Sequence, residues 1–380
     1  MAMPAAVPLT AARRVAIVAP SGETLRLMQG GLLGEIAARR HRILAVAPDF
    51  SGTDVGALDE IGVERAAFAA ESHALKLFSD WKAIGVLKTI ISGWGPHVVL
   101  GCGARSMIYA ALAAKAAGVE HVVLLFGALP QHRFAGELAP DEMPAWRYAQ
   151  ALRAADEAVF HNHDDITLLE RLGLLPPHLP TVVVPGAGID LQRNAQQPFP
   201  PLGQGLVFLM IAPLDKRKGV IEYCKAAEEL RARAPSTRFL LAGAPGEGSF
   251  GLRPEVLPEL GSAVEYLGPA DDVTALLGRC HVFVYPSHAE SMPQPVLEAM
   301  AAGRPIIATN VPGCRDTVDE RVNGCLVPPR DAHALAAAME SFLKRPDLIA
   351  PIARASRAKA ERFCAIEGVN NSMLTALGLA

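Results

Sequence analysis

Residues 290–309 read ESMPQPVLEAMAAGRPIIAT and place two carboxylates, Glu290 and Glu298, around the start of a short helix that feeds a strand. Pro293 and Pro295 fit a helix start, because proline already has the φ angle of the first helical turn and its missing N–H is not needed there. Glu298 is therefore expected near the first turn. A glycine closes the helix and an apolar run follows, which predicts a helix-to-strand unit of an α/β protein.

The same stretch lies where a ligand would bind. The apolar run before it ends at residues 285–287 (YPS), which places Glu290 on the loop beyond the carboxyl end of a strand. The backbone N–H groups of Met292, Gln294 and Val296 are expected to point out of the positive helix end, where a diphosphate binds. The carboxylates suit sugar hydroxyls, so the pattern favours a nucleotide-sugar site. Taken alone, Glu298 also fits an acid that favours a helix N-terminus electrostatically, and Glu290 fits a solvated acid of a loop.

Length and composition favour a globular protein of two domains. The chain has 380 residues, 51% of them hydrophobic and 20% charged, with a net charge of −3, which excludes a disordered chain and a nucleic-acid-binding protein. No apolar run reaches the roughly 18 residues of a membrane span. The six cysteines include no C-x-x-C pair, so a zinc knuckle or disulfide framework is not indicated, and a cytoplasmic location is expected.

Short apolar runs alternate with helical patterns along both halves, which predicts two parallel sheets covered by helices. The first helical pattern is expected over residues 25–38, and the last segment, from about residue 346, also reads as helical. Prolines, glycines and amides interrupt the alternation at residues 194–205 (NAQQPFPPLGQG). The expected domains are therefore residues 1–193 and 206–360, joined by this linker.

Residues 285–329 resemble glycosyltransferase family 4 of retaining enzymes. They carry a Glu, seven residues and a second Glu, followed by AMAAGRPIIAT, VPGCRD and NGCLVPP. The resemblance implies the α/β fold called GT-B, in which two doubly wound Rossmann-like domains face each other across a cleft. It also implies that the last helix, about residues 360–380, packs back on the first domain, the acceptor side.

The resemblance assigns roles to residues of the second domain. Glu298 would hold the ribose hydroxyls and Glu290 the sugar hydroxyls. In the segment PLDKRKG (213–219), Lys218 would bind phosphate, but the family's usual Arg falls at Pro213, so a neighbouring cation must replace it. The catalytic candidates are Glu290 and Lys218, and the donor-binding candidates are Glu298, Lys218, Arg217, Gly219, Ser291, Met292, Pro293, Gln294, Val296 and His288.

Candidates in the first domain are fewer. Ser21-Gly22 and Gly30-Gly31 are placed in the first loop and helix, where glycines allow a ligand to approach the backbone, although a glycine pair also serves tight helix packing. The family's histidine after a strand is missing, which leaves His132 as a displaced substitute. No G-x-G-x-x-G follows the first strand, which argues against a nicotinamide enzyme.

The resemblance implies a hexosyltransferase that moves a sugar from a nucleotide donor, UDP-linked by expectation, with retention, to a saccharide or lipid-linked acceptor. Bacterial polysaccharide or lipopolysaccharide synthesis, with peripheral contact at the inner membrane face, is the implied setting. No Asp-x-Asp motif lies on a suitable loop of the first domain, so no metal or other cofactor is expected. Two alternatives stay open: a nucleotide-sugar epimerase, which would convert the donor without an acceptor, and a non-catalytic partner subunit, which would bind UDP without transfer.

Overall fold

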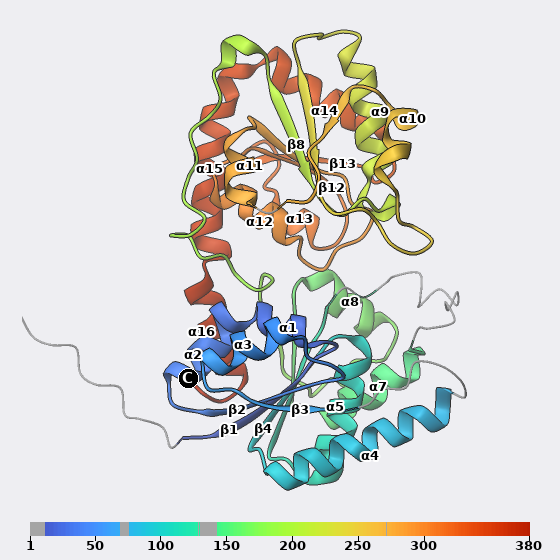
Figure 1. Cartoon of the computed structure of the whole chain (residues 1–380), viewed down its shortest axis with the longest axis vertical. Coiled ribbons are helices and arrows are strands. Elements are labelled where there is room, and N and C mark those ends of the chain that lie inside the picture. The colour runs from blue at the N-terminus through green and yellow to red at the C-terminus, as the bar shows by residue number, and fades with distance from the viewer. Residues whose placement is uncertain (1–11, 69–75, 128, 130–142, 271) are drawn as a thin grey trace, which may run out of the picture. The chain divides into compact units, whose positions relative to one another are not determined.

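The chain folds into two compact units. The computed structural model describes residues 12–68, 76–127, 129, 143–270 and 272–380. The first unit runs to Val184 and also contains Val369–Ala380, while the second comprises Pro185–Gly368 (Figure 1). The domain end expected at residue 193 thus lies within the second unit. In the described part of the chain, every helix is too short or too polar to cross a lipid bilayer.

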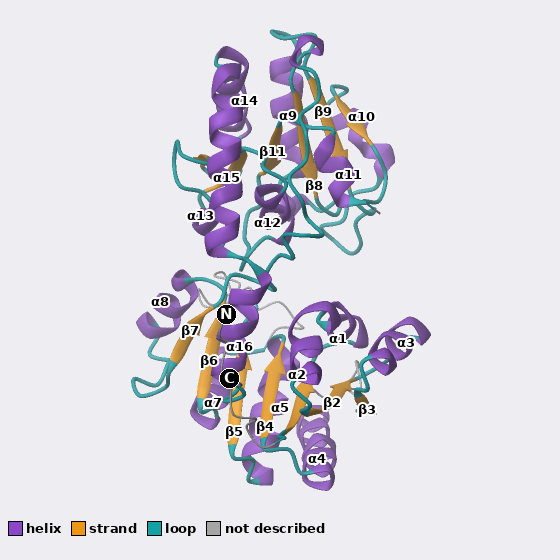
Figure 2. Cartoon of the chain, turned by 90° about the vertical axis from the view of Figure 1, so that its left-hand side faces the viewer, coloured by secondary structure: helices purple, strands orange, loops and turns teal. Residues whose placement is uncertain are grey.

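The first unit is built on a seven-stranded parallel sheet in the order β3-β2-β1-β4-β5-β6-β7 (Figure 2). Its strands are β1 (Arg14–Val18), β2 (Arg42–Ala47), β3 (Glu64–Ala67), β4 (Val98–Cys102), β5 (His121–Leu125), β6 (Glu157–Phe160) and β7 (Thr181–Val183). Its helices are α1 (Gly22–Leu27), α2 (Gly34–Ala38), α3 (Gly52–Glu60), α4 (Lys76–Trp94), α5 (Ala104–Ala117), α7 (Ala145–Ala154), α8 (His163–Arg171) and α16 (Ile366–Ala376), which reaches this unit from the second.

Helices cover both faces of this sheet. Alternate residues of the strands pack either with α4, α5, α7 and α8 or with α1, α2, α3 and α16, which gives two separate apolar cores. Val369, Met373 and Leu374 of α16 are buried in the second of these cores. The C-terminal helix therefore covers part of the first unit's sheet.

The helix expected over residues 25–38 is interrupted. Between α1 and α2, residues Gln29–Leu33 form a π-helical segment in which Gly31 has φ −120° and ψ −112°. A glycine without Cβ adopts this backbone geometry easily, so the Gly30-Gly31 pair breaks the helix. The single-helix prediction is wrong for this reason.

The second unit has a six-stranded parallel sheet in the order β10-β9-β8-β11-β12-β13. Its strands are β8 (Val207–Ile211), β9 (Arg238–Ala242), β10 (Val264–Tyr266), β11 (Val282–Tyr285), β12 (Ile306–Thr309) and β13 (Gly324–Val327). Its helices are α9 (Val220–Arg231), α10 (Leu257–Leu260), α11 (Val273–Gly278), α12 (Gln294–Ala301), α13 (Cys314–Thr317), α14 (Ala332–Lys344) and α15 (Ile349–Phe363).

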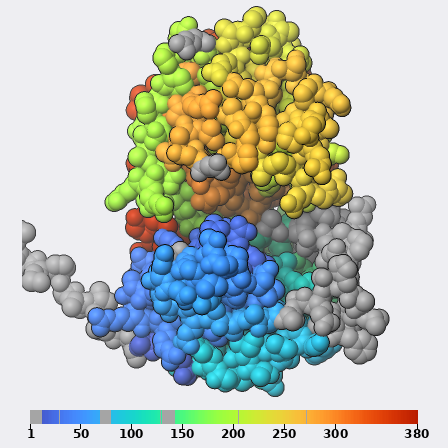
Figure 3. Space-filling view, viewed as in Figure 1, coloured from blue at the N-terminus to red at the C-terminus, as the bar shows by residue number. Residues whose placement is uncertain are grey.

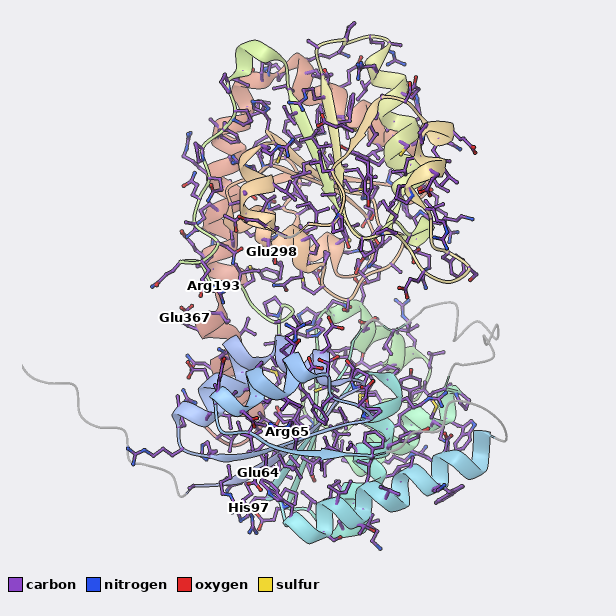
Figure 4. The ribbon with its side chains drawn as sticks, viewed as in Figure 1. Glu64, Arg65, His97, Arg193, Glu298 and Glu367 are labelled. Carbon is purple, nitrogen blue, oxygen red and sulfur yellow. The ribbon has the colours of Figure 1, made fainter. Side chains whose placement is uncertain are left out.

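A histidine ties together the same pair of strands in each unit. His97, just before β4, accepts the backbone N–H of Arg14 on Nδ1 at 3.0 Å. His281, just before β11, accepts the N–H of Val207 on Nδ1, also at 3.0 Å. Figure 4 shows His97 at the amino edge of the first sheet. Each histidine satisfies a donor at the start of a central strand, so His97 has a structural role.

The segment expected to be a linker is fixed to the second unit. Arg304, fully buried, donates from Nη2 to the carbonyls of Gln197 and Pro198 at 3.0 and 2.7 Å. Its guanidinium also lies 4.4 Å from the ring centre of Phe199. A buried cation therefore anchors residues 197–199 of this segment to the second unit.

Candidate active site

The candidate site lies at the carboxyl edge of the second sheet, beside β8 and β11. The chain runs outward from β8 through β9 to β10, then returns to place β11 on the other side of β8. The loops after these two neighbouring strands therefore separate in opposite directions. Such a switch point leaves a crevice in open parallel sheets, and ligands bind there.

Two glycines let the loops at this edge touch. Gly219, with φ +79°, lies where a Cβ would come within 2.0 Å of the carbonyl oxygen of Pro286. Gly313, with φ +74°, lies where a Cβ would come within 2.3 Å of the carbonyl oxygen of Ser291. Both positions exclude any side chain. Close backbone packing around the loop that carries Glu290 therefore accounts for the glycine at position 219 and fixes Ser291, while the donor-binding role of both residues stays a prediction.

Glu290 is held by three side chains. Its Oε1 accepts hydrogen bonds from Lys218 Nζ at 2.5 Å, from Ser287 Oγ at 2.8 Å and from Tyr285 OH at 3.0 Å. The Glu290 side chain is only 11% exposed. The carboxylate consequently has one fixed orientation, and its charge is balanced by a lysine from the loop after the neighbouring strand.

Lys218 remains accessible although it is paired. Its side chain is 30% exposed, and Glu290 is its one side-chain partner among the residues that the structure describes. An ammonium group carries three N–H donors. Two of them therefore remain for an incoming anion, which fits the predicted phosphate-binding role.

Glu298 lies on α12 (Figure 4), in its second turn rather than its first, because the helix begins only at Gln294. Burial raises the pKa of Glu298 to about 7. Within the described residues no hydrogen bond or ion pair compensates this burial. A half-buried carboxylate with a raised pKa at a ligand-binding edge is a functional-site candidate, because a bound ligand can supply the missing donors.

The N-terminus of α12 offers fewer amides than predicted. Pro293 precedes the helix as its N-cap, and Pro295 occupies the second position without an N–H. The N–H of Val296 donates to the carbonyl of Pro293 at 3.0 Å, so the prediction that it faces a ligand is wrong. Met292 and Gln294 keep the predicted positions ahead of and at the first helical residue.

The side chain of Gln294 binds within its own unit. Its Nε2 donates to the carbonyl of Gly188 at 3.3 Å. A Cβ on Gly186 would lie 3.2 Å from Cγ of Met292, so the turn around residues 185–189 packs against the start of α12. These contacts fix the loop that carries the candidate donor-binding residues Met292 to Gln294.

Arg217 is paired away from Glu290. Its guanidinium donates twice to Asp215, from Nε at 3.1 Å and from Nη2 at 2.6 Å, and lies 4.7 Å from the ring centre of Phe250. Burial raises the pKa of Asp215, but the hydrogen bonds from Arg217 outweigh burial and lower it overall. For Arg217 to take over the role of the Arg that the family has at position 213, this pair would have to open. Lys218 is the cation that contacts Glu290.

His288, on the loop after β11, packs against helix α9. Its Nε2 lies 3.2 Å from Oε1 of Glu222 on α9, and Arg330 Nε lies 3.4 Å from its Nδ1. Its backbone N–H donates to the carbonyl of Arg217 at 2.8 Å. The structure thus places His288 in the packing between the two loops, with a buried Nε2 that makes no hydrogen bond within the described residues, and its donor-binding role stays a prediction.

Sequence patterns did not predict the residues that orient Glu290 and Arg217. Tyr285, Ser287 and Asp215 are nearly or fully buried, and each hydrogen-bonds to a candidate residue. Tyr285 and Ser287 stand in the quoted run YPS, at the end of a strand and ahead of an acid. A tyrosine hydroxyl and a serine at such a place are a usable signal, because a buried carboxylate requires donors.

The first-unit candidates are placed as follows. Ser21 is the N-cap of α1 and accepts the N–H of Thr24 at 3.2 Å. Gly22 lies against the carbonyl of Asp49, where a Cβ would approach within 2.8 Å, so this glycine is needed for packing. Gly30 and Gly31 lie in the π-helical segment. His132 lies outside the described residues.

Metal-binding groups do not gather in the described part of the chain. Across residues 12–68, 76–127, 129, 143–270 and 272–380, no three His, Cys, Asp or Glu side chains converge as a metal site would require. The positive charge in the second unit's candidate site comes from Lys218.

Comparison with known families matches both halves of the chain. Residues 205–345 match the family of glycosyl transferases group 1, and residues 28–187 match the glycosyl transferase 4-like domain. The first of these ranges contains the whole sheet of the second unit, and the second range contains the sheet of the first unit except β1, which precedes it.

Named relatives are glycosyltransferases. The N,N'-diacetylbacillosaminyl-diphospho-undecaprenol alpha-1,3-N-acetylgalactosaminyltransferase of Campylobacter jejuni is 23% identical over 350 residues, which cover 87% of this chain and 89% of the relative. The putative colanic acid biosynthesis glycosyltransferase WcaL of Escherichia coli is 28% identical over 208 residues, 52% of this chain and 50% of the relative. The chain thus aligns with nearly all of the first and about half of the second.

Solved structures share the whole fold. Anabaena Alr3699/HepE in complex with UDP superposes with a TM-score of 0.76 at 17% identity, covering 97% of this chain and 100% of that one. A glycosyltransferase from Rickettsia africae gives a TM-score of 0.75 at 17% identity, and the match covers 96% of this chain and 98% of that one. The chain has two Rossmann-like units with parallel sheets, each unit matches a glycosyltransferase family domain, and the solved structures share the two-unit fold. The chain is therefore a glycosyltransferase with the GT-B fold.

Proposed function

We propose that the chain is a retaining enzyme of the family 4 type that transfers a sugar from a UDP-sugar to a saccharide or lipid-linked saccharide in bacterial polysaccharide or lipopolysaccharide synthesis. The observation that carries the proposal is the pairing of Lys218 with Glu290 at the β8–β11 switch point, with Glu298 on the next helix as a buried acid that has no partner among the described residues. The names of the relatives support the acceptor class, and the UDP complex of a structural neighbour supports the nucleotide.

Charge develops on the leaving diphosphate as the bond between the anomeric carbon and its oxygen breaks. Lys218, with two N–H donors left, stabilises that charge, together with the backbone amides at Met292 and Gln294. Donors already in place need no reorganisation during the reaction. On this account Lys218 replaces the divalent cation that other transferases use, and the enzyme is metal-independent.

The two acids hold different parts of the donor. Glu298 accepts hydrogen bonds from the ribose hydroxyls, which relieves the cost of its burial. Glu290, fixed through Oε1, offers Oε2 to the sugar hydroxyls and so orients the anomeric carbon towards the acceptor oxygen. The new glycosidic bond then forms on the face that the diphosphate leaves, with the acceptor proton passing to the departing phosphate oxygen.

A non-catalytic, UDP-binding partner subunit is the second candidate. Pro213 stands where the family has an Arg, and Arg217 is engaged by Asp215, which leaves Lys218 as the cation on Glu290. A site with half the usual positive charge would bind a diphosphate yet stabilise its departure poorly.

Donor screening followed by transfer separates these candidates. The full chain is tested with UDP- and GDP-sugars for thermal stabilisation, and the best donor is then incubated with lipid-linked acceptors. We expect stabilisation by UDP-sugars and transfer that Glu298→Ala reduces by orders of magnitude, while Glu340→Ala, on α14 and paired with Lys344, transfers normally. UDP binding without transfer to any acceptor would favour the partner subunit, and transfer by Glu298→Ala at the parental rate would refute the site.

A further inference from the structure

Three elements of the second unit meet beside the loop that carries Glu290. Glu222 lies in the first turn of α9, His288 lies on the loop after β11, and Arg330 lies between β13 and α14. The helices α9 and α14 pack against each other (Figure 1). In Figure 3 the yellow and orange atoms, of residues from about 240 to 310, share the surface of this unit. The contacts of His288 bring the starts of both helices to the loop.

Arg330 has a strained backbone. Its φ angle is +61°, in the left-handed region that a residue with a Cβ rarely adopts. The next residue, Asp331, is the N-cap of α14 and accepts the N–H of Ala334 at 2.9 Å. The left-handed residue therefore turns the chain from the end of β13 into this helix. A glycine would make the same turn without strain, so an arginine at this position points to a role of its side chain.

The side chain of Arg330 binds His288. Its Nε donates to Nδ1 of the imidazole at 3.4 Å. Within the described residues this is the single hydrogen bond of the ring, because Nε2 is buried and makes none, although it lies 3.2 Å from Oε1 of Glu222. An imidazole that accepts on Nδ1 carries its proton on Nε2. The bond from Arg330 consequently fixes both the orientation and the tautomer of the ring.

His288 in turn belongs to the support of Glu290. Its backbone N–H donates to the carbonyl of Arg217 at 2.8 Å. Oγ of the preceding residue, Ser287, donates to Oε1 of Glu290 at 2.8 Å. A movement of the imidazole would shift the backbone of this neighbour and, with it, the carboxylate. This short path connects the guanidinium of Arg330 to Glu290.

Two other arginines of the described chain share the left-handed backbone but lack such a contact. Arg40 and Arg321 both have φ +62°, and both are exposed. Neither side chain makes a hydrogen bond or an ion pair with another described residue. Arg321 lies on the turn that leads into β13, in the same unit as Arg330. The contact with His288, and not the backbone alone, therefore distinguishes Arg330.

We propose that Arg330 is a positioning residue of the transfer reaction. It holds the imidazole of His288, so that the loop keeps the carboxylate of Glu290 in the orientation that the donor sugar requires. The effect of an oriented group falls steeply when the group moves by about 1 Å. This catalytic role rests on the proposed function, because Glu290 must bind the sugar, whereas the fixation of the loop does not.

Substitution by glycine separates positioning from folding. Arg330→Gly relieves the left-handed strain and removes the guanidinium, so the variant should melt at or above the temperature of the parent while kcat falls about tenfold to a hundredfold. A purely structural role would lower both quantities together. Affinity for UDP, which lacks the sugar, should stay at the parental value. The matched control is Arg321→Gly, which relieves the same backbone strain and should keep the parental kcat.

A second substitution and a double-mutant cycle test the path through His288. Arg330→Asn should act as Arg330→Gly does, because asparagine also tolerates the left-handed backbone. In a His288→Ala enzyme, Arg330→Gly should cause no further loss of kcat. Equal fold losses in the parent and in the His288→Ala enzyme would overturn the proposal. A parental kcat in both Arg330 variants would overturn it as well.

Hydrogen exchange without donor or acceptor keeps this proposal apart from the proposed function. The amides of residues 287–290 should exchange faster in Arg330→Gly than in the parent or in Arg321→Gly. Unchanged exchange would overturn the positioning role, whatever the enzyme transfers. Faster exchange, in a protein whose parent transfers no sugar to any acceptor, would refute the proposed function and leave the fixation of the loop by Arg330 intact.

Discussion

The ammonium nitrogen of Lys218 lies 2.5 Å from Oε1 of Glu290, and this ion pair joins the loops after β8 and β11. The pair predicts opposite effects of two substitutions on nucleotide binding. Lys218→Met removes a cation from the diphosphate site and should weaken UDP binding about tenfold or more, since a charge-assisted hydrogen bond contributes about 1.5–3 kcal/mol. Glu290→Gln removes the competing anion, so UDP should bind at least as tightly as to the parent.

Turnover should separate these variants further. Glu290→Gln is expected to lower kcat by about two to three orders of magnitude, because it disturbs the group that orients the sugar in the transition state. Calorimetric titration with UDP and transfer assays provide both quantities, and Lys225→Met on the exposed side of α9 serves as a control. A Glu290→Gln enzyme that transfers at the parental rate would contradict the role of this carboxylate.

Glu298 should make nucleotide binding depend on pH. Burial raises its pKa to about 7, and ribose hydroxyls favour the charged form, so binding requires loss of the proton. UDP affinity should therefore rise with pH up to about 7 and level off above it, apart from the titration of the phosphate itself. Glu298→Gln should bind UDP more weakly and without this rise, as titrations between pH 5.5 and 8.5 would show.

The buried carboxylate of Glu298 should also lower the free energy of unfolding of the nucleotide-free enzyme. The folded pKa of Glu298 lies above the ordinary value of 4.5, so its contribution to stability is greatest below pH 4.5 and declines as pH rises towards 7. The shift corresponds to about 3 kcal/mol above pH 7. Urea unfolding at pH 8 without nucleotide should find Glu298→Gln more stable than the parent. A less stable variant would show that the carboxylate has a structural partner.

Arg304 should be a major contributor to the stability of the second unit. It is fully buried and donates to three backbone carbonyls, those of Leu277, Gln197 and Pro198. Arg304→Ala leaves these acceptors unsatisfied, and a loss of about 3–5 kcal/mol in the free energy of unfolding is expected. Arg279→Ala, whose side chain is 46% exposed, should lose less than about 1 kcal/mol. Similar losses for both would disprove the anchoring role.

His281 should sensitise the second unit to acid. Its Nδ1 accepts from the N–H of Val207 and its Nε2–H donates to the carbonyl of Pro200 at 3.0 Å, which requires the neutral ring. Burial, with a smaller effect of Arg304, lowers the pKa of His281. The folded pKa is therefore below the unfolded value of about 6.5, and the contribution is present above that pH and lost as pH falls.

The variant His281→Asn isolates this effect, because Asn can still accept the N–H of Val207 but does not titrate. Its free energy of unfolding should fall less steeply than that of the parent between pH 6.5 and 5, by up to about 1.4 kcal/mol per pH unit. His333→Asn, at an 80% exposed side chain, should follow the parent. Parallel curves for parent and His281→Asn would refute the assignment.

The sequence predicted most strands of both sheets because they are continuous β-branched or aliphatic runs. It missed β3, which reads ERAA and lies at the sheet edge, where all four residues are exposed or partly exposed. It also missed β13, whose run GCLV is short and begins with a glycine at which a Cβ would come within 2.0 Å of the carbonyl oxygen of Ile306. Edge strands depend on pairing more than on their own composition.

For the site, sequence patterns and family resemblance predicted which residues to examine but not how they are paired. The resemblance identified Glu290 and Lys218, which the structure brings into contact. The pairing of Arg217 with Asp215 depends on two side chains meeting across a tight turn, and no spacing rule specifies it. The loss of the Val296 amide follows from the helix starting at Gln294, a boundary that sequence patterns define poorly.

A crystal structure of the full chain with UDP would show where the nucleotide binds. We expect diphosphate oxygens within hydrogen-bond distance of Lys218 Nζ and of the amides at Met292 and Gln294, with the ribose hydroxyls on Glu298. Nucleotide bound away from the β8–β11 edge, or bound there with Glu298 making no contact to it, would refute the proposed site.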